Sequence, residues 1–174
     1  MLETSSSLPL QLLGSGQLLS LSPHHQGWLI LQKPFYTEFV GPGAAIGGSF
    51  DVQCKSIFAI GDVQFVAPTT LAEKKQAFQV RINSIQLLHE LMQEISPLQR
   101  AVLLVEQLCS MLGIGLAQEI PHELAAQLIG VMPHNLEIAW NHYLKCQSLN
   151  IPSALDPVLA GESASVSPLR LIKS

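Results

Sequence analysis

The stretch Ile120–Lys145, IPHELAAQLIGVMPHNLEIAWNHYLK, predicts two helices joined by a tight turn. Pro121 and Pro133 can each open a helix, because the first helical position needs no amide donor. Gly130 supplies the left-handed residue that allows a sharp turn between the two helices. We therefore expect a compact helical hairpin here, and the rest of the chain is interpreted around it.

The apolar residues of this stretch repeat at helical spacing. Ala126 is small, Gly130 follows four positions later, and Leu136 is a buried aliphatic candidate, which is the spacing of a helix-turn-helix. Any helical hairpin can share this pattern. We expect the inner faces to be Leu124, Ala125, Leu128 and Ile129 in the first helix, and Leu136, Ala139, Trp140, Tyr143 and Leu144 in the second.

The composition favours a folded cytoplasmic protein. The 174 residues are 48% apolar and 13% charged, enough to form a core. No apolar run reaches the length of a membrane span, and the N-terminus lacks the basic start of a signal peptide. The net charge of −4 argues against a protein that coats nucleic acid through charge alone. A dimer with a local basic patch remains compatible with it.

Residues 8–67 predict a small antiparallel β domain. Turn-forming residues separate short apolar or alternating runs, as in a sandwich or barrel. Gly61-Asp62, between the last two runs, predicts a tight hairpin. The expected strands are Leu8–Leu13, Gln17–Leu21, Trp28–Gln32, Phe35–Val40, Ser56–Ile60 and Val63–Val66.

A long helix is expected over Leu71–Ile95, after a capping box formed by Thr70 and Glu73. One stripe follows a heptad and could pair with a second copy; the alternative is one wide buried face on a monomer. This expected dimerisation seam consists of Leu71, Phe78, Ile82, Ile85 and Met92, completed by Lys75 and His89. A second stripe, expected to pack on the chain's own domains, consists of Val80, Leu87, Leu88, Leu91 and Ile95.

The chain after residue 95 completes the expected organisation. Pro97–Leu112 predicts an amphipathic helix that starts at Ser96 and stops at Gly113. Leu116–Ile120 is expected to be extended, and the tail is expected to be irregular with a short strand near its end, Leu169–Ile172. The expected domains are the β domain over residues 8–68, the long helix over 70–95, the helix-turn-helix over 97–147 and the tail over 148–174.

The order of these elements resembles the catabolite-activator (Crp/Fnr) family of bacterial transcription regulators. Three segments carry the resemblance: GPGAAIGG (Gly41–Gly48), KSIFAIGDVQFVAPTT (Lys55–Thr70) and PLQRAVLLVEQLCSMLG (Pro97–Gly113). The resemblance implies an α+β fold with a small N-terminal antiparallel β-roll of the jelly-roll kind, a long dimerisation helix and a C-terminal, winged-helix-like helix-turn-helix domain. It also implies a cytoplasmic homodimer whose partner is double-stranded DNA.

The chain departs from the family at the cyclic-nucleotide pocket. Family members use a glutamate after the glycine turn and an arginine a few residues later. This chain has Gly48 or Ser49 at the first position and Lys55 at the second. Lysine is a point charge and cannot make the two-pronged contact of arginine with a phosphate. We therefore expect no cyclic-nucleotide binding and no cofactor.

The second helix of the hairpin, 133–145, is the expected DNA-reading helix. Asn135 and Asn141 could pair with adenine edges, but no arginine is present to contact guanine. The expected DNA-binding residues are Pro133, His134, Asn135, Glu137, Ile138, Asn141 and Lys145, with His142 on the same face. Residues 97–174 hold four Lys or Arg against six Asp or Glu. Two alternatives stay open: a helix-turn-helix without strong DNA affinity, and an interaction module that binds another regulatory protein.

Other patterns are weaker. His24-His25 could bind a metal, but without a third ligand a solvated turn is the simpler interpretation. Three cysteines, Cys54, Cys109 and Cys146, are dispersed and are interpreted as core thiols, although some relatives hold iron-sulfur clusters. No nucleophile–base arrangement can be placed by spacing, so we expect neither an enzyme nor a metal site.

Overall fold

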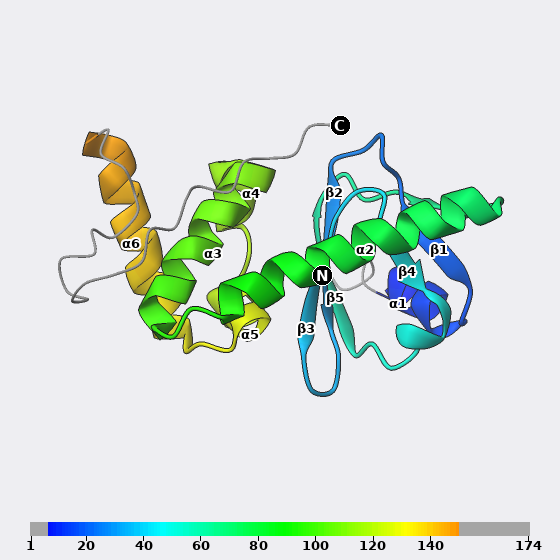
Figure 1. The fold of residues 1–174 in the computed structure, drawn as a ribbon, viewed down its shortest axis with the longest axis horizontal. Helices are drawn as coiled ribbons and strands as arrows, with labels where there is room; N and C mark the ends of the chain where they lie inside the picture. The colour runs from blue at the N-terminus through cyan, green and yellow to red at the C-terminus, as the bar shows by residue number, and fades with distance from the viewer. Residues whose placement is uncertain (1–6, 150–174) are drawn as a thin grey trace.

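The computed structural model describes residues 7–149 and contains two small sheets, a long helix and a helical unit (Figure 1). The helix α2 (Leu71–Met92) runs from the sheets to the helical unit, so it contacts both halves of the molecule. The expected α+β class is confirmed. The predicted strand Leu169–Ile172 lies outside the described residues.

The six strands form two three-stranded antiparallel sheets. One sheet has the order β4 (Ala45–Gly47), β1 (Leu18–Leu21) and β6 (Phe65–Val66), and the other has β3 (Thr37–Val40), β2 (Gly27–Gln32) and β5 (Ser56–Gly61). Leu21, Leu29, Leu31 and Ile46 belong to a core that both sheets share. Three predicted strands, Gln17–Leu21, Trp28–Gln32 and Ser56–Ile60, are confirmed to within one residue at each end.

The predicted hairpin at Gly61-Asp62 is wrong, because the flanking strands belong to different sheets. β5 pairs with β2, whereas β6 pairs with β1. Gly61 has φ of 70°, and a Cβ there would lie 2.3 Å from the carbonyl oxygen of Gln26. The glycine therefore allows a close backbone approach where the chain crosses between sheets.

Three further strand predictions need correction. Leu8–Leu13 forms the helix α1 (Ser7–Gly14), since a short apolar run is compatible with either structure and Pro9 falls in the first turn. Phe35–Val40 shortens to β3 because Phe35 belongs to the turn in which the Lys33 amide donates to the Tyr36 carbonyl. Only the last two residues of Val63–Val66 form β6. Conversely, β4 was not expected: it lies within Gly41–Gly48, where no strand was predicted, next to the short 3₁₀ turn η1 (Gly48–Phe50).

Helix α2 begins at its predicted capping box. The Thr70 hydroxyl accepts from the Glu73 amide, and the Glu73 carboxylate accepts from the Thr70 amide. The helix ends at Met92, before the predicted Ile95. Within the second stripe, Leu88 is buried in the core, but Ile95 lies beyond the helix and is 93% exposed.

The helical unit consists of α3 (Pro97–Leu112), α4 (Ile114–Gln118), α5 (His122–Ile129) and α6 (Pro133–Leu149). α3 starts and stops where the sequence predicts, because the Ser96 hydroxyl accepts from the Gln99 amide and Gly113 follows with a positive φ. The extended segment predicted over Leu116–Ile120 is wrong: most of it lies in α4. α3 and α6 pack around a core that includes Val105, Leu108 and Leu136.

Candidate functional site

The turn between α5 and α6 has the predicted geometry. Gly130 lies in the left-handed region, with φ of 62° and ψ of 46°. The amides of Gly130 and Val131 both donate to the carbonyl oxygen of Ala126, which closes the end of α5. Ala126 and Leu136 are buried where the two helices meet. The two-helix prediction is therefore confirmed, with α5 starting one residue after Pro121 and α6 extending to Leu149.

The inner face of α6 packs largely as predicted. Leu136, Ala139, Trp140 and Tyr143 are buried, and the Trp140 and Tyr143 rings meet edge to face with centroids 6.1 Å apart. Leu144 was expected on this face but is 40% exposed. It follows Tyr143 directly, and one residue rotates a side chain by about 100° around a helix, which turns Leu144 toward solvent.

The outer face of α6 is exposed at the end of the molecule farthest from β4 and β1 (Figure 1). The exposed members of the expected DNA-binding set are His134, Glu137, Ile138, Asn141 and Lys145, and the half-buried ones are Pro133, Asn135 and His142. The His134 Nδ1 lies 3.4 Å from the Glu137 carboxylate, and the His142 ring lies 3.7 Å from the Cys146 sulfur. The β layers leave this face uncovered.

The fixed charge around α6 is acidic. Residues 97–149 contain two basic side chains, Arg100 and Lys145, against four glutamates. Arg100 is half-buried on α3, and its Nε is buried without a hydrogen bond to a described residue. Lys145 is exposed. The structure thus brings no cluster of described cations to this face.

The expected dimerisation seam is exposed along the length of α2. Its apolar members Leu71, Phe78, Ile82, Ile85 and Met92 are 38–69% exposed, and Lys75 and His89 are exposed with them. The buried residues of α2 are Ala77, Arg81 and Leu88, which lie about a quarter of a turn around the helix from the seam and pack against the protein. One face of α2 is therefore used within the chain, while the heptad face is open.

A buried ionic cluster joins α2 to the sheets, and the sequence analysis missed it. Arg81 donates to Asp51 through both terminal nitrogens, at 2.8 and 2.9 Å, and also contacts Glu38. Lys33 lies 2.8 Å from Glu38 and 2.9 Å from Asp51. The Gly47 amide donates to Asp51 as well, at 2.8 Å. One sequence feature could have indicated the cluster. Arg81 lies four residues after Ala77, so this charged residue falls on the face of the helix that packs against the protein.

The cluster fixes the charge states of its members. Burial alone would raise the pKa of Asp51, but hydrogen bonds and charge from Arg81 and Lys33 outweigh burial and lower it. Burial alone would lower the pKa of Lys33, but Glu38 and Asp51 outweigh burial and raise it. Asp51 and Lys33 are thus ionised near neutral pH. Every charged group of the cluster is paired, so the cluster offers neither an uncommitted acid nor an uncommitted base.

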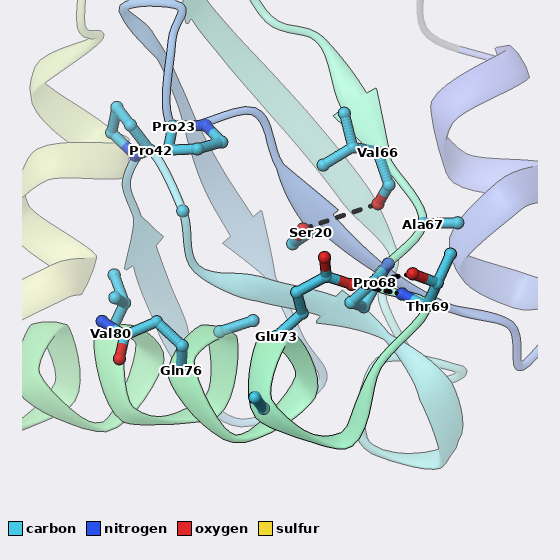
Figure 2. A pocket seen from close by; sticks show the side chains of 13 residues that line it. Ser20, Pro23, Pro42, Val66, Ala67, Pro68, Thr69, Glu73, Gln76 and Val80 are labelled. Atoms are coloured by element: carbon cyan, nitrogen blue, oxygen red, sulfur yellow. Dashed lines mark hydrogen bonds between the residues drawn. The ribbon is translucent and has the colours of Figure 1, made fainter.

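A cleft of about 780 Å³ lies between the sheets and the first turns of α2. Its walls include Pro23, Pro42 and Val66 from the β layers and Ala77 and Val80 from α2 (Figure 2). The positions expected in a nucleotide pocket do not line it: Gly48, Ser49 and Lys55 lie elsewhere, and Lys55 is exposed. The cleft is therefore a different site from the cyclic-nucleotide pocket of the Crp/Fnr family.

The weaker sequence patterns do not converge in space. The His25 ring bonds to the Ser22 hydroxyl at 2.9 Å, and Cys54, Cys109 and Cys146 are unpaired. Across residues 7–149, no three His, Cys, Asp or Glu side chains are placed to hold a metal ion. None of the described helices is both long and apolar enough to cross a bilayer. 

Comparison with protein-family models, curated proteins and solved structures gives no match for this chain. Three features of the described residues can carry a function: the outer face of α6, the α2 seam and the cleft.

Proposed function

We propose that the chain is a DNA-binding transcriptional regulator of the Crp/Fnr type, acting as a homodimer and without cyclic-nucleotide binding. The observation that carries the proposal is that two exposed helix faces lie on elements that follow one another along the chain. The open seam of α2 leads through residues 93–96 into the helical unit, and the outer face of α6 is exposed at the end of that unit. Pairing two copies along α2 then presents two copies of α6 related by a two-fold axis.

The two-fold arrangement defines the expected DNA site. In dimeric helix-turn-helix proteins the second helix enters the major groove, and half-sites lie about 34 Å apart, or a multiple of this. In this chain α6 fills that role, and its first two turns offer His134, Asn135 and Ile138 to the groove. Asn141 lies one turn further on. Asparagine pairs with the N6 and N7 atoms of adenine, so we expect half-sites that contain A·T pairs.

The charge of the α6 face limits the expected affinity. Lys145 is the exposed fixed cation of the helical unit among the described residues, whereas specific DNA binding usually draws on many phosphate contacts. Each neutralised phosphate changes the slope of log K against log salt by about −0.9. A dimer with one or two such contacts per copy therefore has a slope of only about −2 to −4.

The second candidate is a protein-interaction module that binds another regulator. It is favoured by apolar side chains at the same surface: Met132 is 70% exposed, and Ile138 and Leu144 are 39% and 40% exposed. The acidic balance of residues 97–149 also suits a protein partner better than a phosphate backbone. In this second candidate the chain is still a homodimer, but the outer face of α6 binds a protein and not DNA.

The deciding experiment selects duplexes from a random pool and measures binding by fluorescence anisotropy at about 50 and 200 mM salt. The regulator proposal predicts an enriched two-fold site, with Asn141→Ala weakening binding by about tenfold, the scale of one lost base contact. Asn83→Ala is the matched control, since Asn83 is exposed on α2, away from α6. A dimer that enriches no sequence at the lower salt would contradict DNA reading and leave the interaction module.

A further inference from the structure

The cleft beside α2 has mainly apolar walls. Pro23, Pro42, Pro68, Val66, Ala77 and Val80 face it from two sides (Figure 2). Its volume of about 780 Å³ lies within the range of small-molecule sites. Proline has no amide hydrogen, so three of these lining residues bring no backbone donor to the wall. An apolar ligand with few acceptor groups therefore suits the cleft best.

Two polar side chains interrupt the apolar wall. Ser20 is only 5% exposed, and its hydroxyl reaches the Val66 carbonyl oxygen at 3.5 Å, which is long for such a bond. The Glu73 carboxylate points from α2 toward the strand that carries Ser20 (Figure 2). Its Oε2 accepts from the amides of Thr69 and Thr70 and from the Thr69 hydroxyl. These three hydrogen bonds all end on Oε2, and the Thr70 hydroxyl is a further partner of the carboxyl group.

Glu73 makes the cleft selective for charge. The amides of Thr70 and Thr69 lower the pKa of its carboxyl group, so it is anionic at neutral pH. Its carboxylate has lone pairs beyond those used by Thr69 and Thr70, and both it and the Ser20 hydroxyl can accept a hydrogen bond. The Thr69 donors at the rim are already directed to Oε2. A phosphate or carboxylate ligand would meet like charge and find these donors occupied, whereas a cation would find free acceptors.

We propose that the cleft binds a small apolar molecule that carries an ammonium group, with the ammonium between Glu73 and Ser20 and the apolar body against Pro23, Pro42 and Val80. This site is independent of whether α6 reads DNA. It spans the β layers and the first turns of α2, so a bound ligand contacts the helix that also carries the seam.

The test compares three probes with the same six-carbon alkyl chain: hexylammonium, 1-hexanol and heptanoate. Each is titrated to millimolar concentration at constant ionic strength, and binding is followed by amide chemical shifts in two-dimensional NMR spectra. We expect shifts centred on the lining residues Ser20, Gly43 and Val66. We also expect hexylammonium to bind about threefold more tightly than 1-hexanol, the scale of one exposed ion pair, and heptanoate to bind more weakly than the alcohol.

Two variants and one control separate the effect of charge from the effect of volume. Glu73→Gln keeps a capping side chain, because glutamine also serves in a capping box. This variant should bind hexylammonium and 1-hexanol with equal affinity. Glu90→Gln removes the same charge from an exposed position of α2 that does not line the cleft, and it should change nothing. Ala72→Phe fills the cleft from an exposed position and should abolish binding of both probes while the chain stays folded.

Three outcomes overturn the proposal. One is equal affinity of the unmodified protein for all three head groups, and another is a loss with Glu90→Gln as large as that with Glu73→Gln. The third is a set of chemical shift changes centred outside the lining residues.

Discussion

Arg81 of α2 and Asp51 of the β domain face each other through two hydrogen bonds, from Nη1 to Oδ2 at 2.8 Å and from Nη2 to Oδ1 at 2.9 Å. Both side chains are buried, and Glu38 and Lys33 complete the cluster. The Arg81 guanidinium also lies 5.0 Å from the centre of the Phe50 ring. This pair fixes the register between the long helix and the sheets, because a bidentate contact tolerates little displacement.

Removing Arg81 should destabilise the protein strongly. Arg81→Met leaves two buried carboxylates with Lys33 as their remaining cation, and breaking a buried ion pair costs about 3–5 kcal/mol. The free energy of unfolding from urea titration measures this loss. Lys74→Met is the control, because Lys74 is exposed on the same helix and should change stability by less than about 0.5 kcal/mol. A loss below about 1 kcal/mol for Arg81→Met would contradict a structural role for the cluster.

The cluster also predicts how stability depends on pH. The pKa of Asp51 lies below its ordinary value of 3.8, so its contribution is present above pH 3.8 and is lost as the pH falls through the folded-state pKa. The pKa of Lys33 lies above its ordinary value of 10.5, so its contribution is present below pH 10.5 and is lost as the pH rises through the raised value. Stability should therefore decline at both ends of a neutral plateau.

The predicted loss of stability at acid pH can be tested by urea unfolding measured across the acid range. Asp51→Asn should lower stability at neutral pH and reduce the slope below pH 3.8, because the titrating carboxyl group is gone. Asp62→Asn is the matched control, since Asp62 is exposed and outside the cluster. Identical acid slopes for the unmodified chain and Asp51→Asn would assign acid unfolding to other groups.

The seam of α2 should carry the dimer. Ile82→Glu places a charge at a seam position that is 46% exposed in the protomer, so the protomer should stay folded while the dimer weakens at least about tenfold. Sedimentation velocity over a concentration series measures the change. Asn83→Glu adds the same charge one residue away, off the seam, and should leave the dimer intact. An unmodified chain that sediments as a monomer at every concentration would refute the seam.

Substituting Gly130 in the turn should destabilise the protein through backbone conformation and not through steric contact. Gly130→Ala should destabilise by about 1–2 kcal/mol, because an alanine disfavours the left-handed region although nothing lies within 4 Å of the new methyl group. Gly115→Ala is the opposite control: Gly115 lies in α4, also in open space, and alanine should stabilise by about 0.5–1 kcal/mol there. Equal thermal shifts for the two variants would show that the turn is not the cause.

Local signals predicted α2, α3, α5 and α6 but missed the short helices α1 and α4. The Thr70–Glu73 capping box, the Ser96 cap and the Gly130 turn all appear where the sequence places them. Each is decided by hydrogen bonds or backbone angles within a few residues, so the sequence contains the needed information. The segment Leu8–Leu13 shows the limit, because a short apolar run without a cap is compatible with both helix and strand.

Some of the candidate sites could be predicted from the sequence, and others could not. The exposure of the α2 seam and of Asn141 follows from helical periodicity, which the sequence displays. The cleft beside Glu73 does not, since its walls come from Ser20, Pro42 and Val66, which are distant in the sequence. A motif search compares neighbours along the chain and has no access to such a surface.

By itself, the sequence determined α2, α3, α5 and α6, the caps of α2 and α3 and the turn at Gly130, because these depend on neighbours three or four residues away. Only the tertiary structure decided that β5 and β6 belong to different sheets and that Lys33, Glu38, Asp51 and Arg81 share one buried cluster. The desolvation of a charge is acceptable only where opposite charges converge, and that convergence is set by the packing of the long helix on the sheets.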